Sequence, residues 1–299
     1  MNWIKKGLIF KPEGQYDWMT THAQCPTVDQ IDGDLYRIYF SGRDKLNRSR
    51  VGFVEIDIKE PQRILRLSEK PILDLGKLGC FDSNGVTPTC VVNHGGRKYL
   101  YYIGWNRGET VSEVTGLAIS NNRGITFERV SEAPILDRTG REPYLILVLS
   151  SILVEDGLWR MWYDSSDKWI NKTLPKYNIK YAQSYNGISW CRNGIISLDY
   201  EHPKESRISR ACVIKEDNIY KMWYCYAIED GGYTIGYAES GEGITFSRKD
   251  EEVGIHKSKS GWDSEMICYP SVFTHKGKKY MVYNGNNYGE TGFGYAIQE

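Results

Sequence analysis

The sequence of 299 residues has no surplus of charge, because its 38 basic side chains match its 38 acidic ones. A protein that binds nucleic acid or a membrane surface through charge needs a cationic excess, so we predict neither partner. Long hydrophobic runs are also missing, and no apolar stretch approaches the roughly 20 residues that span a bilayer. The first residues show neither the apolar core nor the cleavage site of a signal peptide, so we expect a cytoplasmic protein.

Paired metal or disulfide motifs are absent as well. The seven cysteines are scattered without a Cys-x-x-Cys, and no His-x-x-x-His pair occurs. We therefore predict no disulfide framework, no metal site and no cofactor, although the polar channel of the fold argued below has room for a cation. Phenylalanine is scarce, with 8 residues against 22 Tyr and 9 Trp. Amphipathic aromatic residues in such numbers suit a β-rich protein, and they also suit a surface that binds sugars.

One pattern, a polar turn followed by alternating aromatic and aliphatic residues, recurs five times along the chain. Its leading aromatic residues are separated by 63, 60, 61 and 60 residues, and they are Tyr36, Tyr99, Trp159, Tyr220 and Tyr280. A short apolar segment precedes the pattern in each unit, and short alternating segments separated by Gly- and Asn-rich turns follow it. Four antiparallel strands repeated five times predict an all-β fold, a five-bladed β-propeller of four-stranded antiparallel blades.

The two ends of the chain complement each other. The last unit stops at its third strand, near Tyr295, and has no fourth. Trp3 and residues 7–10 match the pattern of the fourth strand elsewhere, so we predict that the N-terminal segment supplies the missing outer strand and closes the ring. The chain would then form a single domain over residues 1–299. An all-β solenoid with an open end is the alternative.

The functional residues are expected on one face of this propeller. In an antiparallel blade, the start of the first strand and the end of the second lie on the same face, and the long polar segments gather there. The catalytic candidates precede the first strands, and they are His22, Asp82, Glu142, Asp263 and Glu265. The substrate-binding candidates on the same face are Arg43, Asp44, Asn84, Trp105, Asp164, Trp169, Arg207, Arg210, Trp262, Asn284 and Asn286.

These residue types suit the chemistry of glycosides. Cleaving or forming a glycosidic bond takes two carboxyl groups beside the anomeric carbon, one protonated and one ionised. Aromatic rings stack on sugar faces, while Arg, Asn and His side chains bind hydroxyl groups. The sequence therefore predicts a glycosidase-like enzyme that hydrolyses or transfers a glycosyl unit of a carbohydrate or an activated sugar.

The repeat, with acids before the inner strands, resembles that of the five-bladed glycosidase propellers: arabinanases, β-xylosidases, invertases, levansucrases and mannoside phosphorylases. Three segments, residues 37–44, 81–86 and 283–286, are more narrowly similar to propellers encoded among bacterial surface-polysaccharide biosynthesis genes. The wider resemblance implies an acid in the first blade as base or nucleophile, an acid in the second as orienter, and a Glu in the third as general acid. The narrower one implies a task in building surface polysaccharide.

Carried over to this chain, the resemblance is incomplete. Asp82 fits the acid of the second blade and Glu142 that of the third, but His22 and Gln24 stand where the first-blade acid belongs. Either the carboxylates have moved to the fifth blade, as Asp263 or Glu265, or His22 serves as the base, or the reaction differs.

Two further functions remain open. A glycosyltransferase or phosphorylase that uses a phosphate-bearing sugar, such as a nucleotide sugar, would hold the phosphate with Arg43, Arg207 or Arg210. A glycan-binding propeller without turnover would explain the missing first-blade acid. Arg210 should point towards the central channel, where a buried guanidinium needs either a carboxylate or an anionic substrate as its partner.

Overall fold

Nearly all the regular structure in the protein is β-strand. The structure, a computed structural model, describes every residue from 1 to 299. One short helix, α1 (Asn286–Gly289), and one 3-10 turn, η1 (Asp250–Glu252), are the exceptions. No helix here combines the length and the apolar character that a membrane crossing requires. The predicted all-β class is confirmed.

Antiparallel pairing sorts the strands into five groups, each of which we number in chain order. The first group contains β2 (Thr21–Asp32), β3 (Leu35–Arg43), β4 (Ser49–Asp57) and β5 (Ile64–Leu67). The second contains β6 (Gly85–His94), β7 (Arg97–Arg107), β8 (Val111–Ser120) and β9 (Glu128–Arg129). The third contains β10 (Ile146–Glu155), β11 (Leu158–Asn171), β12 (Leu174–Ser184) and β13 (Cys191–Leu198). The fourth contains β14 (Glu205–Glu216), β15 (Ile219–Ile228), β16 (Thr234–Ser240) and β17 (Ser247–Arg248). The fifth contains β18 (Cys268–His275), β19 (Lys278–Asn284), β20 (Phe293–Gln298) and β1 (Trp3–Phe10).

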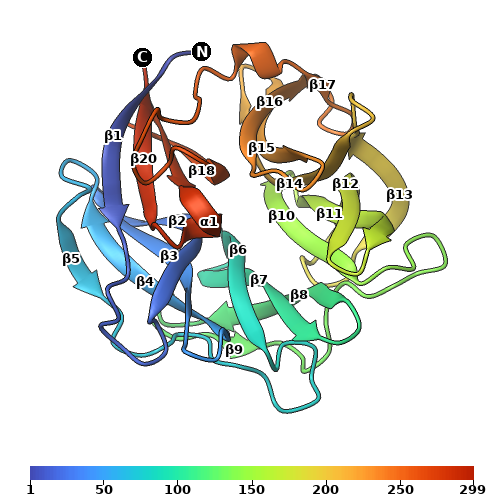
Figure 1. Cartoon of the computed structure of the whole chain (residues 1–299), viewed down its shortest axis with the longest axis horizontal. Coiled ribbons are helices and arrows are strands. Elements are labelled where there is room, and N and C mark those ends of the chain that lie inside the picture. Colours follow the sequence, from blue (N-terminus) through green and yellow to red (C-terminus); the bar gives the residue numbers. More distant parts are fainter.

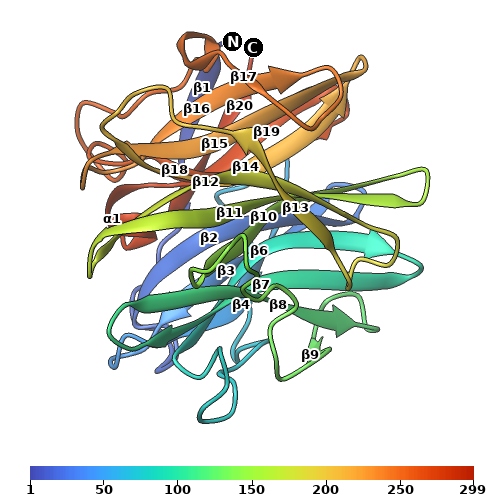
Figure 2. The same cartoon turned by 90° about the vertical axis from the view of Figure 1, so that its right-hand side faces the viewer.

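The groups lie around a common axis, with the first strand of each group innermost (Figure 1). Short parallel contacts between β4 and β6, β8 and β10, and β12 and β14 join the first four groups into one continuous sheet of 16 strands. The fifth group is a separate sheet of four strands. Figure 2 shows strands of different groups in successive inclined layers. This arrangement is propeller-like.

The hydrophobic core is divided among the spaces between neighbouring groups. Tyr36, Ile38 and Phe40 of β3 pack against Tyr280 and Val282 of β19, across the space between the first and fifth groups. Four further clusters fill the other four spaces between consecutive groups. The second strand of each group is covered on both faces, which explains why its sequence reads as a nearly continuous aromatic and aliphatic run.

The N-terminal strand completes the last group. β1 runs antiparallel to β20, from the pair Trp3–Gln298 to the pair Phe10–Phe293. Phe10 joins the cluster between the fifth and first groups, whereas Trp3 joins the one between the fourth and fifth. The two ends of the chain lie together, and the backbone N–H of Glu299 donates to the carbonyl of Asn2 at 3.0 Å.

Every inner strand is interrupted by a β-bulge. The register shifts lie at Gln24/Thr27, Pro88/Cys90, Leu149/Ser151, Ser209/Cys212 and Cys268/Ser271. In three of the groups the bulge contains a residue with positive φ, namely Cys25, Arg210 and Tyr269. A bulge turns side chains away from the alternation of a regular strand, and here it changes which residues face the axis.

Candidate active site

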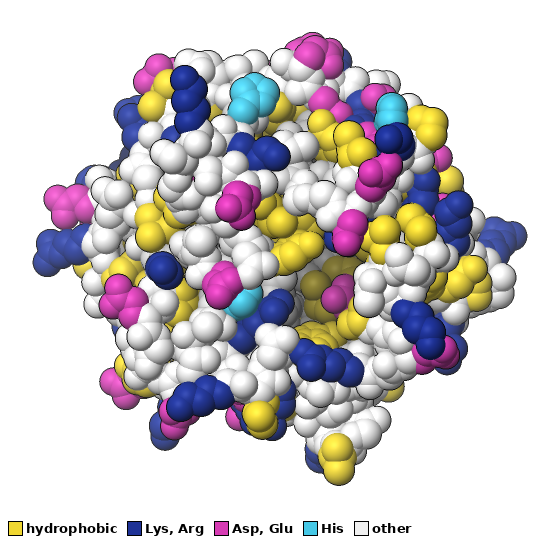
Figure 3. Space-filling model, in the orientation of Figure 1, with side chains coloured by type: hydrophobic (Ala, Val, Ile, Leu, Met, Phe, Trp, Pro, Cys, Tyr) yellow, Lys and Arg dark blue, Asp and Glu magenta, His cyan; other side chains and the backbone are white.

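Two connected cavities lie at the mouth of the central axis. The outer cavity has a volume of about 210 Å³ and is lined by Gln24, Arg43, Asn47, Thr87, Ile103, Trp105, Arg107, Val111 and Glu113. The inner cavity, of about 60 Å³, shares Gln24, Ile103 and Glu113 with it and adds Cys25, Ile146, Val148, Asp164, Tyr177, Ser209, Arg210, Tyr233 and Tyr269. Figure 3 shows the molecule hollowed near its centre, with hydrophobic, acidic and basic side chains at the margin of the hollow.

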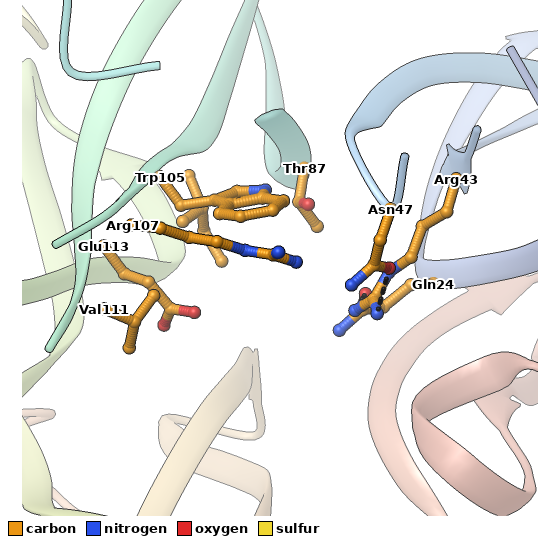
Figure 4. Close-up of a pocket in the computed structure, with 9 residues that line it drawn as sticks. Gln24, Arg43, Asn47, Thr87, Trp105, Arg107, Val111 and Glu113 are labelled. Atoms are coloured by element: carbon orange, nitrogen blue, oxygen red, sulfur yellow. Dashed lines mark hydrogen bonds between the residues drawn. The ribbon is translucent and has the colours of Figure 1, made fainter. Parts of the chain in front are cut away.

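One wall of the outer cavity is built by the hairpin of β7 and β8. Trp105 and Arg107 are two residues apart on β7 and therefore share a face, and Glu113 of β8 lies directly across from Trp105 in the register. The Arg107 guanidinium lies 5.3 Å from the centre of the Trp105 ring, whose Nε1 donates to Ser49 Oγ at 2.7 Å. All three side chains point into the same space (Figure 4).

The opposite wall carries Arg43, the last residue of β3. Its Nη2 donates to Gln24 Oε1 at 2.9 Å and its Nη1 to Asn47 Oδ1 at 3.1 Å, while its Nε is buried without a partner. Both hydrogen-bond partners are neutral amides, and no carboxylate forms an ion pair with this guanidinium. Burial lowers the pKa of Arg43 below its ordinary value.

Glu113 is the only acidic residue that lines the outer cavity. Its carboxyl group makes no hydrogen bond and no ion pair within the protein. Burial raises the pKa of Glu113 to about 7, with the negative charge of Asp164 adding to the effect and Arg43 opposing it. The protonated form of this carboxyl group is therefore accessible near neutral pH.

Asp164 supplies a second acid, deeper in the inner cavity. Its carboxylate accepts hydrogen bonds from the hydroxyl of Ser150 at 2.6 Å, from the hydroxyl of Ser209, and from the backbone N–H of Arg210 at 3.2 Å. Burial raises the pKa of Asp164 to about 6 although these donors favour its ionised form. The two cavities together thus hold two carboxyl groups with raised pKa values.

Arg210 lies at the floor of the inner cavity. From the fourth group, its guanidinium reaches the carbonyl oxygen of Thr89 in the second group and the hydroxyl of Thr27 in the first, the latter at 2.9 Å. A third cavity of about 170 Å³, on the far side along the axis, shares only Arg210 with the inner cavity. Arg210 therefore separates the two cavities, and the partners of its guanidinium within the protein are neutral.

Three of the predicted catalytic acids line neither the outer nor the inner cavity. Asp82, Glu142 and Asp263 are buried, and each lies just before the first strand of its group. Each accepts a hydrogen bond from a tyrosine of the second strand and pairs with a cation of the outer strand, an arrangement we name the acid clasp. The clasps are Asp82 with Tyr102 (3.1 Å) and Arg129 (2.7 Å), Glu142 with Tyr163 (2.8 Å) and Arg192 (3.1 Å), and Asp263 with Tyr283 (3.0 Å) and Lys5 (2.6 Å).

The fourth group has a related arrangement. There Tyr224 donates to Asp250, and Arg248 pairs with Asp250 at 2.7 Å and with Glu205 at 2.8 Å. Recurrence of the same contacts in several groups indicates that the clasp ties the segment before the inner strand to the rest of its sheet. The contacts engage one oxygen of Asp82, whose Oδ1 is buried without a partner, and both oxygens of Glu142. The direct catalytic role of the three acids stays a prediction.

The other two catalytic candidates differ in their surroundings. His22 is buried beside Arg43, with its Nδ1 2.9 Å from Thr21 Oγ1, and burial lowers its pKa to about 4. It is therefore neutral at physiological pH. Glu265 is exposed at the rim, and its backbone N–H donates to Asn286 Oδ1 at 2.8 Å.

Several predicted binding residues are engaged in contacts within the protein. Asp44 pairs with Arg48 and Arg50 at 2.9 and 2.8 Å. Asn284 donates to the carbonyl oxygens of Ala23 and Gly292, joining the fifth group to the first.

Trp262 and Asn286 serve the local structure of the fifth group. Trp262 stacks on Tyr283 with 5.2 Å between ring centres. The amide of Asn286 binds the backbone of residues 261, 265 and 266.

Three further predicted residues, Asn84, Arg207 and Trp169, line neither cavity. Asn84 accepts a hydrogen bond from the backbone N–H of Arg107 at 3.3 Å and so supports the wall of the outer cavity. Arg207 donates to the carbonyl oxygen of Gly231 at 2.8 Å and lies 5.2 Å from the ring centre of Tyr233. Trp169 belongs to the long hairpin of β11 and β12 and is half-buried there. Of all the predicted residues, Arg43, Trp105, Asp164 and Arg210 line the two cavities.

Glu113 and Arg107 are not among the residues predicted from the sequence. The predicted residues come from the segments before the first strands and from the ends of the second strands, and the last of them on β7 is Trp105. The available signal was the hairpin itself, because a polar residue opposite Trp105 at the start of the third strand must share its face. The structure brings together no group of three or more His, Cys, Asp or Glu side chains that could hold a metal ion.

The fold is shared with known enzymes of low sequence identity. A solved structure described as a glycoside hydrolase superposes with a TM-score of 0.76 at 18% identity, covering 98% of this chain and 90% of its own. A structure from work on the GH130 family of mannoside phosphorylases, which contains glycoside hydrolases that target β-1,2 mannosidic linkages in Candida mannan, gives 0.72 at 15% identity, with 100% and 94% covered. A thermostable family-43 glycoside hydrolase gives 0.67 at 17%, with 93% and 88% covered. At such identities these likenesses establish the propeller-like fold alone.

Sequence relatives match over their whole length. No protein-family model matches the chain. Two proteins of Mycobacterium tuberculosis, named uncharacterized protein MT1551 (strain CDC 1551 / Oshkosh) and uncharacterized protein Rv1502 (strain ATCC 25618 / H37Rv), are 40% and 39% identical over 303 residues, covering 100% of both chains in each case. The chain therefore belongs to the same protein family as these two mycobacterial proteins.

Proposed function

We propose that the protein is a glycosidase-like enzyme that breaks or forms a glycosidic bond in the outer cavity, with Glu113 as its proton donor and acceptor. The observation that carries this proposal is the unpartnered carboxyl group of Glu113, whose pKa of about 7 suits proton transfer at neutral pH. A carboxyl group built only for structure would have hydrogen-bond partners, as Asp82 and Glu142 do.

Asp164 complements Glu113 in this proposal. Three hydrogen-bond donors favour the ionised form of Asp164, whereas Glu113 has none, so Asp164 is the group more readily ionised. Glycoside chemistry uses such a division, in which a protonated acid acts on the leaving oxygen and a negative charge stabilises the positive sugar ring of the transition state. Trp105, with the Arg107 guanidinium lying over its ring, forms one wall of the cavity in which the sugar would bind.

We also propose that the fold is a closed five-bladed propeller. Four antiparallel strands in each group, the pairing of β1 with β20 and a hydrophobic cluster in every space between groups support a five-bladed propeller that β1 closes. We also propose a cytoplasmic task in bacterial surface-polysaccharide metabolism, acting on a carbohydrate or a nucleotide sugar. This part rests on the narrower sequence likeness described above.

The test is turnover by the purified protein on a panel of aryl glycosides and nucleotide sugars. We expect Glu113→Gln to lower kcat by about 100-fold or more, because the amide cannot transfer a proton. Glu128→Gln, which changes an exposed residue of β9 in the same group, should leave kcat unchanged. Equal turnover by wild type and Glu113→Gln would remove Glu113 from the mechanism, and loss in Asp82→Asn alone, with its fold intact, would return that role to the acid clasp.

A further inference from the structure

We infer that the outer cavity binds a phosphoryl group of the substrate between the guanidinium groups of Arg43 and Arg107. The inference rests on the proposed function for the rest of the substrate, and it names the chemical class of the ligand. It starts from the charge balance of the cavity, because two arginines and a single carboxyl group line it and leave it positive in either protonation state of Glu113.

The contacts of Arg43 hold its side chain in place without neutralising it. Gln24 and Asn47 orient the guanidinium through their carbonyl oxygens, and neither carries a charge. The buried Nε remains without any acceptor. A desolvated cation is costly unless an anion accompanies it, so an arginine fixed by amides is prepared for an anion from outside the chain.

The nearest acid along the chain is turned to other partners. Asp44 follows Arg43 directly, yet its carboxylate accepts from Arg48 and Arg50 and from the backbone N–H of Leu46. Elsewhere in the protein, buried arginines such as Arg37 and Arg248 have carboxylate partners at 2.6 to 2.8 Å. The guanidinium of Arg210 in the connected inner cavity likewise has only neutral partners, so arginines without a carboxylate partner are a shared feature of the two cavities.

Arg107 faces Arg43 from the other wall of the outer cavity. Its guanidinium rests on Trp105, and its backbone is held by the side chain of Asn84. No carboxylate pairs with it. Figure 4 shows the head groups of Arg107 and of Arg43 directed into the space between the walls, with Glu113 on the same wall as Arg107. Two guanidinium groups that converge on one space form a strong binding site for phosphate oxygens.

The neighbouring Glu113 is compatible with this ligand. A phosphoryl dianion would repel an ionised carboxylate, but Glu113 accepts a proton near neutral pH and then donates a hydrogen bond instead. The anion could be free phosphate used as a second substrate or a phosphate ester within the sugar donor, and both offer the same oxygens to the arginines. Binding measurements distinguish them.

We would measure binding by isothermal titration calorimetry at low salt, using inorganic phosphate, pyrophosphate, glucose 1-phosphate and UDP-glucose, with methyl glucoside as the neutral probe. Arg43→Gln and Arg107→Gln should each weaken the binding of the phosphorylated probes by about tenfold or more, because a charge-assisted hydrogen bond is lost. Arg97→Gln, at an exposed arginine of β7 that forms no ion pair, serves as the matched control and should leave binding unchanged. Tight binding of inorganic phosphate would identify free phosphate as the ligand, and tighter binding of the esters would place the phosphoryl group on the sugar donor.

Glu113→Gln separates this inference from the proposed function. The variant should lose turnover and still bind the phosphorylated probes, since the arginines are intact. If no phosphorylated probe binds more tightly than methyl glucoside, or if both arginine variants bind as wild type does, the phosphoryl site is overturned. Turnover of aryl glycosides that depends on Glu113 would survive that result.

Discussion

The ionised form of Glu113 lowers the free energy of unfolding, because the carboxylate is removed from water. Its pKa in the folded protein is about 7, above the ordinary value of 4.5, so the folded state binds this proton more tightly than the unfolded chain does. The protonated Glu113 makes its full contribution to the free energy of unfolding below about pH 4.5, and this contribution is lost as the pH rises through 7. The charged form is the unfavourable one because the carboxylate has neither a hydrogen bond nor an ion pair.

The pH dependence of unfolding tests this residue without any substrate. We expect Glu113→Gln to unfold at a higher temperature than wild type at pH 8, because the amide never ionises, and the advantage should shrink towards pH 5. Calorimetry from pH 5 to 8 measures the difference, with Glu128→Gln as the exposed control. If the difference in unfolding temperature between Glu113→Gln and wild type does not change with pH, Glu113 titrates as an ordinary glutamate.

At the scale of secondary-structure elements, the acid clasp explains why carboxylates precede several inner strands. The acid fixes the entry into the first strand, the tyrosine belongs to the second, and the cation to the outermost. Burying a tyrosine hydroxyl and a carboxylate is tolerable only when both have partners, and here they are partners of each other. The clasp thus joins three elements of one sheet through two polar contacts of a single carboxylate.

Asp82→Asn should therefore reduce stability more than activity. Removing the charge leaves Arg129 with a buried neutral neighbour, at a cost on the order of 3 kcal/mol. Asp74→Asn, at an exposed carboxylate that pairs with Arg50, should cost less than about 1 kcal/mol. Urea unfolding measures both, and kcat per folded molecule should stay near the wild-type value in each. A strong loss of kcat in stable Asp82→Asn would instead support the catalytic role expected from the sequence.

The elements were largely predictable from the sequence, and the orientation of side chains at the site was not. The repeat beginning at Tyr36 indicates the strands and their order because strand alternation and turn residues are local signals. Whether Asp82 faces a cavity or a tyrosine depends on contacts with Tyr102 and Arg129, which lie far along the chain. The bulges also make the orientation of side chains hard to predict, since one extra residue at Arg210 changes which side chains point to the axis.

At the scale of the whole molecule, the pairing of β1 with β20 couples the two ends of the chain. β1 contributes Trp3, Ile9 and Phe10 to two of the hydrophobic clusters and covers the edge of β20. Without it, the last sheet would expose an unpaired edge, which favours aggregation.

For the stability of the fold, the position of the chain ends should matter less than the pairing of β1 with β20. Deletion of residues 1–10 should give an aggregated or unfolded protein. A circular permutant that joins the ends through a short linker and opens at the exposed turn of Gly95 and Gly96 should keep a cooperative unfolding transition. Size-exclusion chromatography and thermal unfolding distinguish the two variants, and a soluble, fully stable deletion variant would show that β1 is dispensable.

Arg210 closes the binding space at its inner end. Because its guanidinium bars the axis between the inner cavity and the one beyond, whatever enters from the mouth must also depart by the mouth. If a reaction there yields two molecules, the one formed deeper waits until the outer one has gone. The two products then leave in a fixed order, and the outer product competes with substrate for the same opening. Product release is therefore expected to limit the rate of turnover.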